Sequence, residues 1–336
     1  MGRITARRRV TRVRRGAQPT TRVDVLAVEE PLEMRVNGER LAVTMRTPGH
    51  DVELASGFLV SEGVLVRAED LATARYCAGA GSAASGPSLP GAGSAASGPS
   101  LPGAGSAASG PSQPGAGSDG LNSYNVLDVA LAPGVASPDP SLSRDFTISS
   151  ACGVCGKDSI ESVTTRSHFD VSDDPLIVDA DAVLDLPGRL REHQKVFAKT
   201  GGLHAAALFD GRTGELRVVR EDVGRHNAVD KVIGWALAHD LLPLRGQILQ
   251  VSGRASFELV QKAIMAGVPM LSAVSAPSSL AVDLAEQHGL TLAGFVRGES
   301  MVLYSGADRV SCNDANPDEE FSIATTSIAT TRKETS

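Results

Sequence analysis

Residues 247–275 read QILQVSGRASFELVQKAIMAGVPMLSAVS, and this stretch decides the fold class. Two short apolar runs, 247–253 and 268–275, have the length and composition of buried strands. Between them, 255–267 has the composition and length of a helix. A strand, a helix and a second strand joined by short connections predict neighbouring parallel strands with the helix packed on the sheet. In such sheets ligands bind outside the carboxyl ends of the strands, so the strand-to-helix junctions are the places to search for chemistry.

The same alternation continues on both sides of this stretch. Strand patterns at 203–210 and 215–221 lead into a helix pattern at 225–240. After it, 278–289 favours a helix and 290–296 another strand. These patterns predict an α/β domain over 146–311, a mixed sheet flanked by helices.

The first half of the chain favours a smaller, β-rich region over 19–145. Apolar residues alternate on both sides of Asn37-Gly38, the pair that suits a type I′ hairpin turn. A helix is expected at 47–63, with Thr47 as its cap, and a strand at 123–131. Residues 79–114 are three copies of a twelve-residue unit rich in glycine, serine and alanine. Such a composition cannot bury a core, so 79–118 is expected to be a disordered surface insertion.

Charge is unevenly distributed in this chain of 336 residues and net charge −7, because seven arginines fall in the first fifteen residues. A disordered, solvated arm at 1–18 and a disordered tail at 312–336 are the expectations. Nucleic-acid binding by the arm stays an alternative that we do not expect. No apolar segment has the length of a signal peptide core or a membrane span. With four cysteines, the chain is expected in a reducing cytoplasm.

Three junctions, at 220–231, 251–258 and 274–281, place glycine, serine or proline where a helix begins. Free backbone N–H groups at a helix N-terminus favour anions such as phosphate, and Arg225 and Arg254 can bind phosphate through two hydrogen bonds. Serine at a helix start can equally be a simple cap. His204 and His226 are further candidates to contact a ligand. The chain has no P-loop and no G-x-G-x-x-G sequence, so it is not an ordinary nucleoside triphosphatase or dinucleotide oxidoreductase.

The segment SSACGVCGKDSIESV, 149–163, contains Cys152 and Cys155 in Cys-x-x-Cys spacing. A structural zinc needs four ligands, and the chain offers no second pair close by. A redox pair stays open, although the thioredoxin-like context is absent. The neighbouring glycines and Lys157 favour a mobile, reactive thiol, because a nearby cation lowers a thiol pKa and the thiolate is the form that attacks sulfur.

Long blocks around these motifs, among them SSACGVCGKDSIES, TGGLHAAALFD and REDVGRHNAVDKVIGWAL, closely resemble the formate dehydrogenase accessory sulfurtransferases of the FdhD type. The resemblance covers about residues 20–310, without the repeat insertion. It implies a cytoplasmic, homodimeric sulfurtransferase with a cytidine-deaminase-like α/β fold that lacks zinc. Such a carrier accepts sulfur from a cysteine desulfurase and passes it to the molybdenum bis(molybdopterin guanine dinucleotide) cofactor of formate dehydrogenase.

The resemblance also assigns residues. Cys152 matches the persulfide position and Cys155 its companion. Cofactor binding falls on the stretch FVRGES, namely Phe295, Val296, Arg297, Gly298, Glu299 and Ser300, and we add Ser252 and Arg254 from the junctions. The competing hypothesis is a non-catalytic chaperone of the molybdenum cofactor, or a zinc-stabilised binding module.

Overall fold

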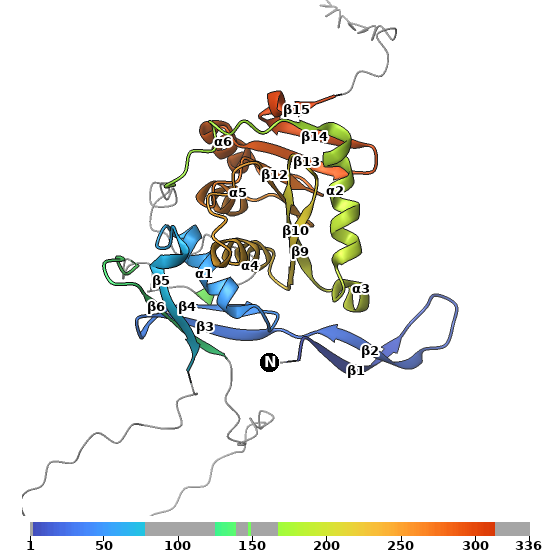
Figure 1. Cartoon of the computed structure of the whole chain (residues 1–336). Helices are drawn as coiled ribbons and strands as arrows, with labels where there is room; N and C mark the ends of the chain where they lie inside the picture. Colours follow the sequence, from blue (N-terminus) through green and yellow to red (C-terminus); the bar gives the residue numbers. More distant parts are fainter. Residues whose placement is uncertain (1–2, 78–124, 139–146, 149–166, 313–336) are drawn as a thin grey trace, which may run out of the picture.

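The computed structural model of the chain describes residues 3–77, 125–138, 147–148 and 167–312 (Figure 1). It has a mixed α/β fold with sheets flanked by helices, as the sequence predicts. No helix in these ranges is long and apolar enough to cross a membrane.

A six-stranded sheet forms the centre of the α/β part, in the order β10-β9-β11-β12-β13-β14. β11, β12 and β13 are parallel, whereas β9 and β14 run antiparallel to their neighbours. The parallel run arises because each strand is followed by a helix that returns the chain to the same edge. The strands are β9 (His204–Asp210), β10 (Leu216–Asp222), β11 (Gln247–Val251), β12 (Met270–Ala273), β13 (Thr291–Arg297) and β14 (Ser300–Ser305).

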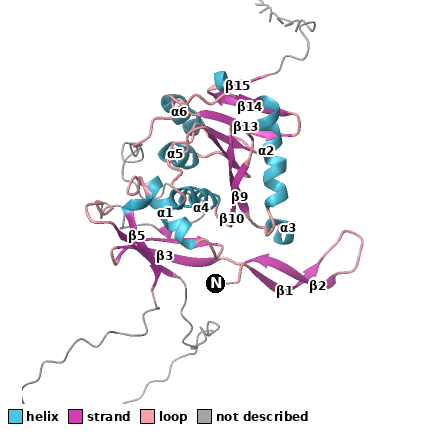
Figure 2. Ribbon diagram, viewed as in Figure 1, coloured by secondary structure: helices cyan, strands magenta, loops and turns pink. Residues whose placement is uncertain are grey.

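Helices cover both faces of this sheet, so its strands are apolar on both sides (Figure 2). On β11, Leu249 belongs to the hydrophobic cluster under one set of helices, and Ile248 belongs to a second cluster under α2. The helices of the first face are α4 (Arg225–Ala238), α5 (Phe257–Met265) and α6 (Ser279–His288); the other face has α2 (Ala180–His193), followed by the short α3 (Phe197–Thr200). A small parallel pair, β8 (Val178–Asp179) with β15 (Val310–Ser311), lies beside α2.

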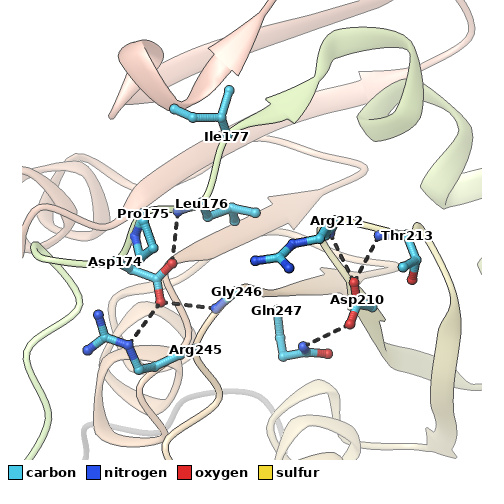
Figure 3. Close-up of a pocket in the computed structure, with 10 residues that line it drawn as sticks. All are labelled: Asp174, Pro175, Leu176, Ile177, Asp210, Arg212, Thr213, Arg245, Gly246 and Gln247. Atoms are coloured by element: carbon cyan, nitrogen blue, oxygen red, sulfur yellow. Dashed lines mark hydrogen bonds and ion pairs between the residues drawn. The ribbon is translucent and has the colours of Figure 1, made fainter.

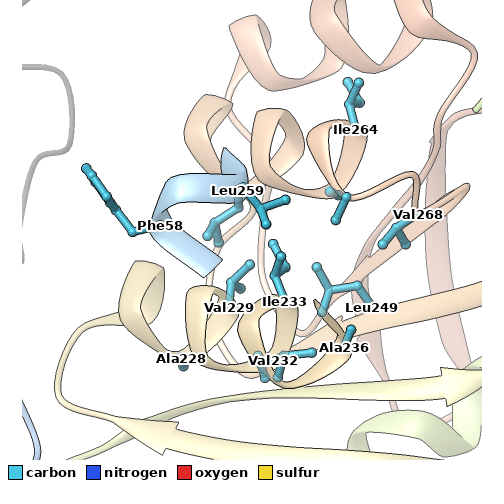
Figure 4. Close-up of a cluster of buried hydrophobic side chains, with 14 of the residues drawn as sticks. Phe58, Ala228, Val229, Val232, Ile233, Ala236, Leu249, Leu259, Ile264 and Val268 are labelled. Carbon is cyan, nitrogen blue, oxygen red and sulfur yellow. The ribbon is translucent and has the colours of Figure 1, made fainter. Parts of the chain in front are cut away.

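The first half of the chain forms a second, five-stranded sheet in the order β5-β6-β3-β4-β7, with helix α1 (Asp51–Ser61) packed on it. Its hairpin turns at Asn37-Gly38 as the sequence predicts. Figure 4 shows Phe58 of α1 in the hydrophobic cluster that also holds Val229 of α4 and Leu259 of α5. One core therefore joins the two halves. The strands are β3 (Glu30–Val36), β4 (Glu39–Arg46), β5 (Leu71–Tyr76), β6 (Val126–Leu131) and β7 (Thr147–Ile148).

Helices α1 and α4 cross at two glycines. A Cβ atom at Gly57 would lie 1.8 Å from the carbonyl oxygen of Asp230, and one at Gly234 would lie 1.8 Å from the carbonyl oxygen of Glu53. The two backbones touch, so neither position tolerates a side chain without a shift of a helix.

The arginine-rich N-terminus differs from the expectation of disorder. β1 (Thr5–Arg12) and β2 (Thr20–Ala27) form an antiparallel hairpin with a continuous register from Thr5↔Ala27 to Arg12↔Thr20. Threonine and valine are frequent in both strands, and β-branched residues favour extended backbone even where charge is dense. Charge density alone was therefore a poor guide to the structure of this segment.

Two smaller differences concern the predicted boundaries. The helix expected from Thr47 begins at Asp51, because His50 occupies the cap position with a left-handed backbone (φ 58°). Thr47 instead donates its backbone N–H to Asp222. The repeat insertion (79–118), nearly all of the tail (312–336) and the predicted domain boundary at 145/146 fall outside the described residues.

Candidate functional site

The ends of the three parallel strands lie side by side at one edge of the six-stranded sheet. Ser275, after β12, donates its backbone N–H to the carbonyl of Gly253, after β11, at 3.3 Å. Phe295, near the end of β13, donates its backbone N–H to Ser275 at 3.2 Å. The junctions at 251–258 and 274–281 and the 295–300 stretch are thus brought together, as parallel pairing predicts.

The 295–300 stretch is a tight turn between β13 and β14. Phe295 has a left-handed backbone (φ 52°), and Gly298 (φ 57°) lies inside the turn that pairs Arg297 with Ser300. The guanidinium of Arg297 lies 5.7 Å from the centre of the Phe295 ring. Non-glycine residues rarely adopt positive φ, and such strain often marks functional positions. The turn therefore holds an arginine and an aromatic ring in a fixed relation at the edge.

Four groups that carry or can carry positive charge gather at the start of β9. The pKa of His204, the first residue of β9, is lowered from 6.5, first by burial and then by the charges of Arg225, His226 and Arg254. Because these groups come from the start of β9, the start of α4 and the connection after β11, only the folded sheet collects them. An anion bound at this edge would offset their mutual repulsion.

His226 is held by two neighbours on the α5 side of the edge. Its Nε2 lies 3.3 Å from the Ser256 hydroxyl and 3.7 Å from a carboxylate oxygen of Glu258. The hydrogen bond from His226 is the largest cause that lowers the pKa of Glu258 to about 2. Glu258 therefore stays ionised and places a negative charge beside His226 at this edge.

The start of α4 leaves backbone donors at this edge. Its cap residue, Gly224, has no side chain to accept from the first turn of the helix, and within the described residues the buried Nε of Arg225 lacks a hydrogen-bond partner. At the start of α5, Ser256 does not cap the helix through its side chain, but the Glu258 carboxylate accepts from its own backbone N–H. The start of α4 therefore favours an anionic ligand.

Some polar residues of the predicted junctions also make contacts within the protein. The Ser252 hydroxyl accepts a hydrogen bond from the backbone of Ala205 at 2.8 Å, which ties β11 to β9. Asp222 is fully buried and accepts from the Lys231 ammonium at 2.6 Å and from Asn227 at 2.9 Å. The Ser252 hydroxyl thus helps to hold the edge together, and its predicted role in cofactor binding stays a prediction. Within 220–231, Asp222, Asn227 and Lys231 form a buried polar network.

Cys152 and Cys155 lie outside the described residues. The described chain before them ends at β7, which pairs with Val43 and Thr44 of β4. The Thr44 hydroxyl donates to the side chain of Asn227 in the first turn of α4 at 3.3 Å. The chain thus enters the cysteine segment beside the helix start that carries Arg225.

A hollow of about 490 Å³ lies at the opposite edge of the same sheet (Figure 3). The carboxylates that line it accept hydrogen bonds from backbone N–H groups. Asp174 accepts from Leu176 and Gly246, each at 3.0 Å. Asp210 accepts from the N–H groups of Arg212 and Thr213, which holds its pKa well below the usual range. These bonds shape loops, and the hollow offers matched control positions for experiments on the first edge.

The fold and this edge define an α/β protein that gathers cationic side chains and the uncapped start of α4 at one edge of its central sheet. The model of the FdhD/NarQ family matches residues 27–311. The chain belongs to the FdhD/NarQ family. The match begins at the end of β2, so it leaves out nearly all of the arginine-rich hairpin.

Known proteins similar to the chain agree with this assignment. It is 53% identical over 316 residues to a protein of Streptomyces coelicolor named sulfur carrier protein FdhD, covering 94% of this chain and 99% of the relative. A protein of the same name from Mycobacterium tuberculosis is 52% identical, covering 92% and 100%. The crystal structure of a candidate formate dehydrogenase accessory protein from Desulfotalea psychrophila has the same fold, with a TM-score of 0.63 at 19% identity, covering 92% and 100%.

Proposed function

We propose that this chain is a sulfur carrier that delivers sulfur to the molybdenum bis(molybdopterin guanine dinucleotide) cofactor needed by formate dehydrogenase. Relatives about half identical over nearly their whole length carry the name sulfur carrier protein FdhD. The donor is a cysteine desulfurase, and the exchange takes place in the cytoplasm between that enzyme, a homodimer of this chain and formate dehydrogenase.

The observation that carries the proposal is the cationic edge. Arg225, Arg254 and Arg297 come from three separate junctions and lie at one edge of the sheet with the uncapped start of α4. A guanine dinucleotide brings phosphates, which guanidinium groups and helix N-termini bind. The chain leads into the cysteine segment from the same place, so one edge supplies both the ligand site and the tether of the thiol.

The transfer conserves atoms and electrons when it is written as two exchanges. The Cys152 thiolate attacks the outer sulfur of the desulfurase persulfide, forms Cys152–S–S⁻ and releases the desulfurase thiolate. Cys155 then attacks the inner sulfur, closes a disulfide with Cys152 and releases the outer sulfur as sulfide to the molybdenum. A dithiol reductant must reopen the disulfide before the next cycle.

Loading of the carrier tests the first exchange. After incubation with a cysteine desulfurase and cysteine, the protein should gain one sulfur atom, found by mass spectrometry on the peptide that contains Cys152. Cys152→Ala should remove this gain. The matched control is Cys312→Ala, because Cys312 is an exposed thiol on the same chain. A Cys152→Ala protein that still gains the sulfur would refute the role of Cys152.

Ligand binding tests the edge separately. Titration with GDP should show that Arg254→Ala weakens binding by about tenfold or more, since a hydrogen bond to a charged group contributes about 1.5–3 kcal/mol. Arg212→Ala, at the opposite edge, should bind like the wild type. Equal affinities for the two variants would remove the phosphate site from this edge.

The chaperone and zinc-module hypotheses make the opposite predictions. In a strain without its own carrier, a non-catalytic chaperone restores formate dehydrogenase activity even as Cys152→Ala, and a zinc module contains stoichiometric zinc. In the described ranges there is no group of three or more histidine, cysteine or acidic side chains placed to hold a metal ion. Complementation with Cys152→Ala and Cys155→Ala, together with metal analysis, separates the three.

A further inference from the structure

A hollow of about 430 Å³ follows β10, the outermost strand on one side of the six-stranded sheet. Residues 216–221 of β10 line it, together with the apolar side chains of Pro48, Val196 and Leu203. We call this hollow the β10 groove. In the described part of the chain β10 pairs with β9 alone, so its other side presents backbone N–H and C=O groups that another strand could pair with.

The exposed rim of the β10 groove is basic. His50, His193 and Lys195 line it and are exposed. Among the described residues, no carboxylate pairs with Lys195. The carboxylate that lines the groove, Glu221, is already occupied, because it accepts from two backbone N–H groups at the start of α3, at 2.9 and 2.7 Å. The groove therefore suits an extended segment that is acidic at one end and partly apolar.

A segment of this kind follows the described part of the chain. Residues 314–320 read DANPDEE and contain four acidic side chains and no basic one. Residues 321–331 read FSIATTSIATT, which is uncharged and rich in isoleucine and threonine, residues that favour strands. We call 321–331 the tail segment. In an extended chain Phe321 and Ile323 point to one side, and Ser322 and Ala324 to the other, so the two sides differ in polarity.

The position of α2 sets the distance that the tail must cover. β15, after which the tail begins, pairs with β8, and Asp179 of β8 caps the start of α2. His193, at the other end of α2, lines the β10 groove, and Figure 1 shows β15 near one end of α2 and α3 at the other. A helix of 14 residues spans about 21 Å, which an extended chain covers in about six or seven residues.

This distance matches the order of residues in the tail. About seven residues after Cys312 the chain reaches the acidic run 318–320, which then lies beside Arg191 and His193 in the last turn of α2. The tail segment follows directly and reaches β10. A short tether also gives a high effective concentration, so the groove of the same chain is favoured over that of a second copy.

We propose that the tail segment docks in the β10 groove of its own chain as an added edge strand, with 318–320 held by the basic end of α2. Docking pairs the free side of β10 and covers the apolar side chains of the groove. By composition alone the tail is expected to be disordered, so its order depends on these contacts. The proposal goes beyond sulfur transfer: its readout is the protection of β10, so either can fail while the other holds.

Hydrogen exchange of the full chain, followed by mass spectrometry, tests the docking. In the wild type, the tail segment and the amides of β10 that face away from β9 should exchange slowly. Phe321→Asp with Ile323→Asp should make both exchange at least about tenfold faster, because amides that lose their hydrogen bonds are open to solvent. The matched control, Ser322→Asp with Ala324→Asp, changes the other side of the extended segment and should stay protected.

An exchange of charges tests the acidic contact. Glu319→Lys with Glu320→Lys should weaken the protection, and so should Arg191→Glu with Lys195→Glu at the end of α2. A chain that carries all four substitutions again places opposite charges together, so it should regain the protection that each pair alone loses. Arg40→Glu reverses an exposed arginine elsewhere and should leave the protection unchanged.

Three results would overturn the proposal. These are fast exchange of the tail segment in the wild type, protection of β10 that persists in Phe321→Asp with Ile323→Asp, and a chain with all four charge substitutions that stays unprotected although each pair keeps the wild-type circular dichroism. Dilution tests the other occupant. Protection that falls on dilution would show that the tail of a second copy fills the groove, and not that of the same chain.

Discussion

At the scale of single residues, the cationic edge places an acid and a histidine in contrasting surroundings. Glu258 lies 3.7 Å from His226, whose hydrogen bond lowers the pKa of Glu258 to about 2, whereas burial and then the neighbouring charges lower the pKa of His204. The edge therefore keeps Glu258 ionised and favours the neutral form of His204.

Glu258 gives a prediction about stability and pH. Its folded pKa of about 2 is below the ordinary 4.5, so the folded state binds fewer protons than the unfolded state between these values. Its contribution is complete above pH 4.5 and is lost as the pH falls towards 2. Glu258→Gln should flatten this part of the stability profile, measured by urea unfolding from pH 2 to 7. Glu286→Gln, at an exposed position of α6, is the control and should leave the profile unchanged.

His204 gives a prediction about ligand binding. Its lowered pKa reflects burial and nearby positive charge, and a bound phosphate group offsets that charge and raises the pKa. Binding of GDP should then be accompanied by proton uptake at His204 and should strengthen as the pH falls. His204→Gln should remove this pH dependence, measured by calorimetry in buffers of different ionisation enthalpy. An unchanged dependence in His204→Gln would assign the proton to another group.

At the scale of secondary-structure elements, the contact between α1 and α4 joins the two halves of the fold. The backbone of α4 at Asp230 lies where a Cβ atom of Gly57 would be, and the backbone of α1 at Glu53 lies where a Cβ atom of Gly234 would be. The first turn of α4 also carries Arg225 and His226. The glycine contact therefore holds the first half of the chain in place and positions the cationic edge.

Alanine substitutions test this contact. Gly234→Ala should destabilise the protein by about 3 kcal/mol or more, because the added methyl group would overlap the carbonyl of Glu53. Gly188→Ala is the matched control, a glycine within α2 with open space around it, and it should stabilise by about 0.5–1 kcal/mol. Thermal and urea unfolding measure both. Similar stabilities for the two variants would show that the helices separate at little cost.

At the scale of the whole molecule, buried ion pairs connect regions that are distant in sequence. The Lys231 ammonium donates to the Asp222 carboxylate at 2.6 Å and to the carbonyl of Thr47 at 2.9 Å. The Lys262 ammonium donates to Asp230, which also accepts from Ser61 of α1. Through Thr47 and Ser61, each ion pair thus joins the first half of the chain to the α/β part, near the cationic edge.

Removal of one buried partner should be costly. Lys231→Met leaves the fully buried Asp222 without its cation, so it should destabilise the protein by about 3–5 kcal/mol. Arg22→Met removes an exposed pair with Asp24 and should cost less than about 1 kcal/mol. Urea unfolding compares the two. Equal small losses would mean that Asp222 is satisfied by its remaining donors.

Much of the α/β part could be predicted from the sequence, because strand and helix periods are local properties. The helix at 225–240 and the strands that surround it lie within two residues of their predicted ends. The N-terminal hairpin of β1 and β2 could not be predicted, because its many arginines indicate a disordered segment. The threonines and valines that favour its paired strands are a weaker signal in the sequence. The sequence could not show which polar residues of 220–231 are buried. Asp222, for example, is buried against Thr47, which lies 175 residues away in the chain.

By itself the sequence determined the elements, the family and the candidate residues, since these follow from local patterns and from blocks of residues that the family shares. Only the tertiary structure decided that His204 and the first turn of α4 join Arg254 at the predicted edge, that the Ser252 hydroxyl accepts from the backbone of Ala205, and that α1 and α4 touch at glycines. The physical reason is that charge interactions and close packing act between groups near in space, and folding brings these groups together from distant parts of the chain.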